Sequence, residues 1–264
     1  MPLRIRMDAS DIGLQKSLKI NHRALSARIA KLASGLRINQ ASHDAAGLAQ
    51  SEGMRANVSG FAQAIRNSEL AMNQTQVAEG SLTETHSILD RLRELSVQAA
   101  SSGITDANRA TIQTEYAQLT AEVDRLAQTL PNGVRVFQIG PHPGDGNQVE
   151  IDIMQASAPE IGLSGRSVVS QVGAQHTLSA IDNAIAQISV QRSDIGVLQN
   201  RLGFAIRSNE HAMENLQASE SVIRDADVAL EASQLTGERI RTQANISILS
   251  QQNVNRQQVL NLLG

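Results

Sequence analysis

Apolar side chains recur at alternating steps of three and four residues over long parts of the chain, the spacing of a helix face packed in a coiled coil. One such run lies in the first half and comprises Ile112, Tyr116, Leu119, Val123, Leu126 and Leu130. It follows the breaker Gly103, and Thr105 with Asp106 stands where a helix cap is expected. The pattern therefore predicts a helix that begins near Thr105.

Two further helices are predicted upstream of this run. Leu18, Leu25 and Leu32 recur every seven residues, as expected for a coiled-coil seam. A second apolar face comprises Leu82, Leu89, Leu92, Leu95 and Ala99, and this helix should end near Ser102-Gly103.

The second half holds one apolar face for more than 40 residues, from Leu178 to Ile223. At the α-helical rise this helix would be about 70 Å long. A compact globule of the same chain length has a radius of gyration of roughly 18 Å, so its diameter is well below that length. The sequence therefore predicts an elongated rod.

Proline separates the two halves, because it interrupts helices. Four of the five prolines lie between residues 131 and 159, whereas 3–130 and 160–264 contain none. In between, Val149, Ile151 and Ile153 alternate with acidic residues and predict a strand, with the segment around Val134 and Val136 as its partner. The predicted fold is mainly α, with long antiparallel helices, a terminal coiled coil and a small β-hairpin region.

Composition argues against an enzyme. Of the 264 residues only four are aromatic, and there is no cysteine, so disulfides, thiolate metal sites and cysteine nucleophiles are excluded. The six histidines are scattered, and the acidic residues between Asp145 and Asp152 lack the EF-hand spacing. No phosphate-binding loop or serine nucleophile motif is present. We expect no catalytic residue, no metal and no cofactor.

Charge is unevenly distributed although the net charge is only -3, which gives no reason to expect nucleic acid. Residues 1–37 carry a net charge of +6 and residues 209–238 a net charge of -6. We expect the two segments to meet, within one chain or between copies, although two solvated helix faces would give the same pattern.

The basic segment is amphipathic but lacks aromatic side chains, so partner helices are favoured over a membrane surface. No stretch is apolar enough to span a membrane, and the start lacks the apolar core of a cleavable signal.

Residues 32–49 read LASGLRINQASHDAAGLA, which resembles the N-terminal signature of bacterial flagellin, LSSGLRINSAxDDAAGLA. Residues 88–100 (ILDRLRELSVQAA), 199–202 (QNRL), 225–227 (DAD) and 257–264 (QQVLNLLG) resemble later flagellin segments in the expected order. Departures from the family pattern occur at His43, where Asp is common, at Arg256, where Pro is common, and at Pro131 before Asn132-Gly133.

The resemblance implies a domain plan without the variable outer domains of many flagellins. It has an inner coiled-coil domain from both termini and a rod domain with a hairpin. The expected segments are 1–42 and 226–264 for the coiled coil, 43–130 and 177–225 for the rod helices, and 131–176 for the hairpin and loop region.

The resemblance also implies that the chain is a structural subunit that self-assembles into the extracellular flagellar filament. Family partners would be further flagellin copies, the type III export apparatus, an export chaperone and the filament cap. The terminal helices are expected to fold on polymerisation, because their apolar stripes can be buried only against neighbouring copies. The expected seam residues are Leu14, Leu18, Leu25, Ile29, Leu32, Leu36, Ile240, Ala244, Ile248, Leu260 and Leu263. A hook-filament junction protein is the alternative with the same terminal plan, and a monomeric lipid-binding helical module is a second one.

A further partner follows from resemblance alone. In many flagellins an Arg, a Leu and a Glu on the rod are recognised by an animal Toll-like receptor, and the matching residues are Arg91, Leu95 and Glu115. The same three residues are expected to serve packing between subunits of the rod.

Overall fold

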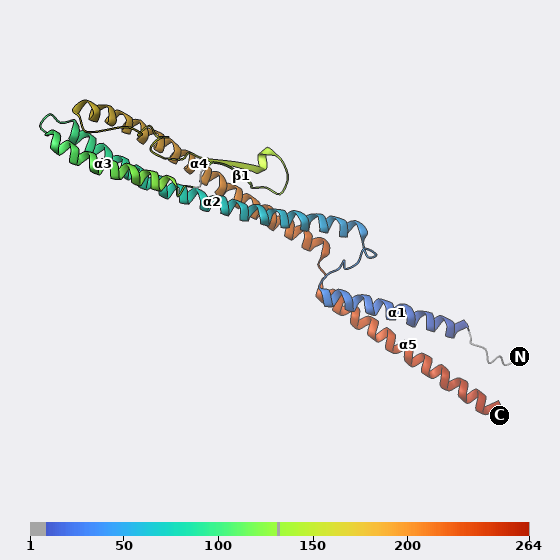
Figure 1. The fold of residues 1–264 in the computed structure, drawn as a ribbon. Helices are drawn as coiled ribbons and strands as arrows, with labels where there is room; N and C mark the ends of the chain where they lie inside the picture. Colours follow the sequence, from blue (N-terminus) through green and yellow to red (C-terminus); the bar gives the residue numbers. More distant parts are fainter. Residues whose placement is uncertain (1–8, 131–132, 264) are drawn as a thin grey trace. The chain divides into compact units, whose positions relative to one another are not determined.

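The computed structural model describes residues 9–130 and 133–263 (Figure 1), with side chains described except at 9–11, 259–260 and 262–263. Its elements in chain order are α1 (Ala9–Ser34), α2 (Ala45–Ala100), α3 (Asp106–Ala127), β1 (Gly133–Gln138), the short 3-10 helix η1 (Asp145–Asn147), β2 (Gln148–Ile153), α4 (Gln171–Arg224) and α5 (Val228–Leu263). The prediction of a mainly α fold with a small hairpin is confirmed.

The chain forms two compact units, one built from residues up to 56 together with 215 onward, and the other from residues 57–214. We call them the terminal unit and the central unit. The links between helices, at residues 35–44 and 225–227, contain the expected domain boundaries at 42/43 and 225/226. The compact units instead part inside α2 and α4, at 56/57 and 214/215, and both helices run without a break through these positions. The five-segment domain plan thus remains a prediction.

In the central unit α2, α3 and α4 lie side by side, as Figure 1 shows in cyan, green and brown. Arg91 on α2 pairs with Glu115 and Ser81 lies beside Thr129, so α3 runs antiparallel to α2. The contacts of α2 with α4 also run in opposite directions, because Arg93 pairs with Asp182 whereas Glu79 accepts from Gln199. The predicted antiparallel arrangement is confirmed for α2 against α3 and for α2 against α4.

The predicted start of α3 is confirmed by its cap. The hydroxyl oxygen of Thr105 accepts from the backbone N–H of Asn108 and satisfies one of the free donors of the first turn. Ile112, Tyr116, Val123 and Leu130 of the predicted seam are buried in the central core, and Leu119 is half-buried beside them.

The seam of α2 consists largely of small side chains, many of them hydroxyl residues. Besides Gly47, Ser51 and Leu95, the buried positions of α2 follow the three-four spacing and are Ala64, Ser68, Ala71, Thr75, Ala78, Leu82, Thr85, Leu89, Leu92, Ser96 and Ala99. The buried hydroxyls are satisfied by their own helix, as where Thr85 donates to Ser81 and Ser96 donates to Leu92, each to a carbonyl oxygen. This seam can therefore bury hydroxyls without partners from other helices.

The hairpin contacts α2 through Arg135 and Gln74 and contacts α4 through the carbonyl oxygen of Asp152, which accepts from Gln191. Its two strands are antiparallel, as predicted from their alternation. Val149, Ile151 and Ile153 of β2 are buried in the core, whereas Val134 and Val136 of β1 face outward. In the register, Val134 lies opposite Asp152 and Val136 opposite Glu150, so valines and carboxylates share the outer face.

Candidate assembly surfaces

The segment that carries the flagellin-like signature forms the link between α1 and α2. Gly35 ends α1 with a φ of 70°, a conformation that glycine adopts without steric cost. Asp44 begins α2, since its carboxylate accepts from the N–H of Gly47 at 2.9 Å. A Cβ on Gly47 would lie 2.5 Å from the Asp44 carboxylate and 2.9 Å from Ile38, which is buried. The signature therefore encodes a tightly folded turn, in which His43 is exposed.

This link also pairs with the link between α4 and α5. The N–H of Arg37 donates to the carbonyl oxygen of Arg224 at 2.7 Å, and that of Ala226 donates to Gly35 at 2.9 Å. The predicted seam residue Leu36 lies in the resulting antiparallel bridge, opposite Asp225. Two segments almost 190 residues apart are thus joined by backbone bonds, which places the start of α5 next to the end of α1.

Ion pairs connect α1 to α5. Glu231 is buried, and its carboxylate contacts Arg28 at 2.8 Å and Lys31 at 3.5 Å. A buried carboxylate needs such partners, because leaving it unpaired away from water costs several kcal/mol (about 3–5). The prediction that the basic first segment meets the acidic segment is confirmed within one chain for these residues.

Apolar side chains of the terminal helices are left largely uncovered. Among the described side chains of α1 and α5, the buried ones are Glu231 and Glu238, and no apolar side chain is buried. Of the expected seam, Leu14, Leu18, Leu25 and Leu32 on α1 are half-buried, and Ile29 is exposed. On α5, Ala244 is exposed, Ile240 is 65% exposed and Ile248 46%. Leu260 and Leu263 lie outside the residues whose side chains are described.

The face of α5 that meets α1 is mainly polar, which the sequence analysis missed. Its least exposed described positions are Glu231, Leu235, Gly237, Glu238, Thr242, Asn245, Leu249, Gln252 and Arg256, and all but Gly237 recur with the three-four spacing. The signal is present in the sequence, since Glu231, Glu238, Asn245 and Gln252 recur every seven residues. The predicted seam is apolar, whereas Ile240, Ile246 and Ile248 of α5 are exposed and lie outside this face.

The three residues matched to the receptor site separate into two environments. Arg91 and Glu115 form an ion pair at 2.8 Å on the surface, and Arg91 also contacts Glu94 at 3.0 Å. Hydrogen bonding to Glu115, then to Glu94, raises the pKa of Arg91 above its usual value. Leu95, by contrast, is only 2% exposed and belongs to the central core. The structure brings Arg91 and Glu115 together at the surface and buries Leu95 in the core.

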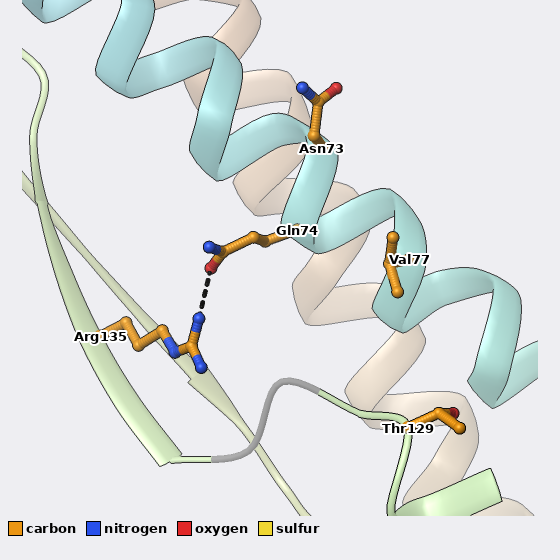
Figure 2. A pocket seen from close by; sticks show the side chains of 5 residues that line it. All are labelled: Asn73, Gln74, Val77, Thr129 and Arg135. Carbon is orange, nitrogen blue, oxygen red and sulfur yellow. Dashed lines mark hydrogen bonds between the residues drawn. The ribbon is translucent and has the colours of Figure 1, made fainter.

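A shallow open pocket lies where β1 passes over α2 near the end of α3 (Figure 2). Its lining residues are Asn73, Gln74, Val77, Thr129 and Arg135, and Arg135 donates to the side-chain oxygen of Gln74 at 3.1 Å. This lining contains no carboxylate, histidine or activated nucleophile, so it offers no acid–base chemistry. In the part of the chain that the structure describes, no cluster of His, Asp and Glu could hold a metal ion, and no helix is apolar and long enough to cross a membrane.

The chain matches two family profiles. Residues 5–138 match the bacterial flagellin N-terminal helical region, and residues 178–263 match the bacterial flagellin C-terminal helical region. The stretch between the two matches contains β2 and the loop that leads to α4.

Relatives agree with these matches. A flagellin from Halalkalibacterium halodurans is 40% identical over 88% of this chain and 89% of its own length. The flagellar filament 30.7 kDa core protein of Treponema maltophilum is 37% identical over 98% of this chain and 99% of its own length. A solved structure described as a flagellar hook-associated protein from Vibrio parahaemolyticus covers 69% of this chain with a TM-score of 0.57 at 15% identity, a likeness of fold alone. On these matches, the chain belongs to the bacterial flagellin family.

Proposed function

We propose that this chain polymerises by covering the apolar faces of α1 and α5 with the terminal helices of neighbouring copies. As a flagellin it is a structural subunit of the extracellular flagellar filament. The observation that carries the proposal is the absence of any buried apolar side chain among those described on α1 and α5. Large exposed apolar surfaces mark protein–protein contacts, and their burial contributes about 25 cal/mol per Å².

The polar contact between α1 and α5 explains why folding should await assembly. Leu235 and Leu249 are the large apolar residues on the face of α5 that meets α1, among positions whose side chains are described. Such a helix pair gains little apolar burial to offset its loss of conformational entropy. We infer that the terminal helices are disordered in the monomer and become ordered when neighbouring copies cover Ile240, Ala244 and Ile248.

Seeded polymerisation tests this proposal. Purified protein is depolymerised with heat or acid, returned to neutral pH with filament seeds, and viewed by electron microscopy. We expect long filaments from the parent, and soluble monomers from Leu25→Asp with Leu32→Asp and from Ile240→Asp with Ile248→Asp. The matched control, Gln15→Asp with Ser17→Asp, adds the same charges at exposed polar positions of α1 and should polymerise.

Any of three results would contradict the proposal. Normal filaments from both double variants would show that these faces do not carry assembly. If the parent forms short caps that stop growing after a few copies, a hook-filament junction protein is favoured. If the parent binds vesicles as a monomer and shows no concentration threshold for polymerisation, a lipid-binding module is favoured.

Export partners form a finer part of the proposal and rest on family resemblance. We propose that the unfolded chain leaves the cell through the flagellar type III apparatus with an export chaperone, and that the filament cap guides its insertion. A strain without the export apparatus should retain the protein, detected by antibody in the cell fraction and not in the medium. Undiminished secretion from that strain would refute this route.

Recognition by an animal Toll-like receptor is a second proposal, supported by the exposed Arg91–Glu115 pair. Because Leu95 is buried in this chain, it would act by supporting the surface around the pair and not by direct contact. Reporter cells that carry the receptor should respond less to Arg91→Ala than to the parent. Arg125→Ala, an exposed residue of α3, is the matched control, and an unchanged response to Arg91→Ala would refute receptor contact at this site.

A further inference from the structure

The outward face of α4 carries a second apolar seam in the central unit. Val190, Val197 and Phe204 recur every seven residues and are 63%, 63% and 67% exposed. The buried residues Ile188, Ile195 and Leu202 lie two positions earlier at each step, which is about 200° around a helix. The outer seam therefore points away from the core and covers about 21 Å of helix.

Basic side chains flank this seam near Phe204. The Arg207 guanidinium lies over the Phe204 ring, 4.8 Å from its centroid. Arg201, one turn earlier, donates to the backbone carbonyl of Gln148 at 3.4 Å. Neither arginine has a carboxylate partner in the ion pairs of the described residues, so both positive charges remain available to an acidic surface.

The outer face of the hairpin has the opposite charge and the same apolar character. Val134 and Val136 are 57% and 59% exposed, and their cross-strand neighbours Asp152 and Glu150 are exposed beside them. Neither carboxylate has a basic partner within the chain as far as the structure describes it. An apolar row next to an acidic row therefore lies on a twisted two-stranded ribbon.

We propose that the outer α4 seam of one copy packs against the outer face of the β1–β2 hairpin of a second copy. The valines of the hairpin would cover Val197 and Phe204, and its carboxylates would pair with Arg201 and Arg207. Because the two surfaces differ, the contact is head-to-tail, and such contacts propagate into open helical assemblies instead of closing into dimers. This inference rests on the proposed function, since it assigns a contact within the filament.

Charge reversal tests the pairing. Arg201→Glu with Arg207→Glu, and separately Glu150→Arg with Asp152→Arg, should each raise the critical concentration for seeded polymerisation at least about tenfold, the effect of 1.4 kcal/mol. All four substitutions in one chain should restore the critical concentration to within about threefold of the parent value, because the opposite charges meet again. Glu160→Arg, at an exposed loop residue of the central unit, is the matched control and should leave the critical concentration unchanged. Helix content of each monomer, from circular dichroism, should match the parent.

The result distinguishes this inference from the proposed function. If the parent fails to polymerise, the proposed function itself is wrong. If the parent polymerises and the reversed variants do so equally well, or the fourfold variant shows no recovery, the assigned contact is wrong.

The absence of native cysteine permits a second test by crosslinking. A chain with Val136→Cys and Val197→Cys, treated with a short bismaleimide, should give a ladder of covalent oligomers from filaments and none from dilute monomer. Val136→Cys with Gln118→Cys, which replaces an exposed residue of α3, should give no ladder. A ladder from the α3 pair with none from the α4 pair would overturn the proposal.

Discussion

The guanidinium of Arg109 lies against the carbonyl end of α2, where its Nε donates to the carbonyl oxygen of Ala99 at 2.9 Å. Its Nη2 donates to the carbonyl oxygen of Ser101 at 2.8 Å, and its Nη1 pairs with the carboxylate of Asp106 at 2.9 Å. The last carbonyls of a helix lack intrahelical partners and carry partial negative charge, so a buried cation is favourable there. Arg109 thereby joins the end of α2 to the start of α3.

Replacing this side chain should destabilise the central unit. Arg109→Lys keeps the charge but cannot reach three acceptors in fixed directions, so we expect the free energy of unfolding to fall by about 2–3 kcal/mol. Chemical denaturation followed by circular dichroism measures this loss. Arg125→Lys, in an exposed pair with Glu122, is the control and should cost less than about 1 kcal/mol. Equal losses for the two variants would refute the bridging role of Arg109.

Leu95 and Arg91 should differ sharply in their effect on stability. Leu95→Ala removes a buried side chain and leaves a cavity, so it should cost about 2–5 kcal/mol. Arg91→Ala breaks a surface ion pair and should cost less than about 1 kcal/mol. Thermal unfolding of the two variants provides the measurement. A Leu95→Ala protein as stable as the parent would mean that Leu95 is not part of the core. If Leu95→Ala is destabilised as expected, signalling experiments should vary Arg91 instead.

The small residues along α2 predict that the helix tolerates the loss of a buried hydroxyl better than the insertion of a larger side chain. Thr85→Val keeps the shape and removes a hydroxyl that bonds only within its own helix, so the free energy of unfolding should change by less than about 1 kcal/mol. Ala78→Leu inserts a large side chain at a fully buried position and should cost about 1–3 kcal/mol. Urea denaturation compares the two, and a large loss for Thr85→Val would show that its hydroxyl serves another helix.

Glu231 should control how α1 and α5 pair during assembly. Glu231→Ala leaves Arg28 and Lys31 without their partner, so we expect a critical concentration for polymerisation about tenfold or more above that of the parent, equivalent to 1.4 kcal/mol. Sedimentation of filaments at several protein concentrations measures it. Glu210→Ala, an exposed residue of α4, should behave like the parent. An unchanged threshold for Glu231→Ala would mean that this buried pair contributes nothing to assembly.

Tyr116 should make the central unit sensitive to alkali. Burial raises the pKa of its hydroxyl above the usual value, so the folded state favours the neutral form. The stability that the buried, neutral hydroxyl of Tyr116 contributes to the folded state is therefore fully present below the unfolded pKa of about 10. It is lost as the pH rises through the higher folded pKa. Because this is the one tyrosine of the chain, phenolate absorbance reports it alone. Tyr116→Phe should retain more of its stability above that pH, and an identical alkaline profile would refute the burial effect.

The helices and strands of the central unit follow from local patterns in the sequence. The three-four spacing, the cap at Thr105 and the alternation around Ile151 depend on neighbours within one helix or strand, so they can be read locally. The opposite charges of the two terminal segments likewise predicted that they meet, as Arg28 and Glu231 do.

Which helix faces are covered depends on contacts between distant parts of the chain. An amphipathic helix shows the same periodicity whichever stripe its partner occupies, so Ile240 and Ile248 could not be assigned from spacing to one side of α5. The backbone bridge at Leu36 and the ion pairs of Glu231 turn the polar face of α5 toward α1. In the central unit, Leu95 is buried in the core and Arg91 is exposed, although both lie on the same helix. Spacing shows that a helix has an apolar face, but whether that face is covered depends on residues far away in the chain.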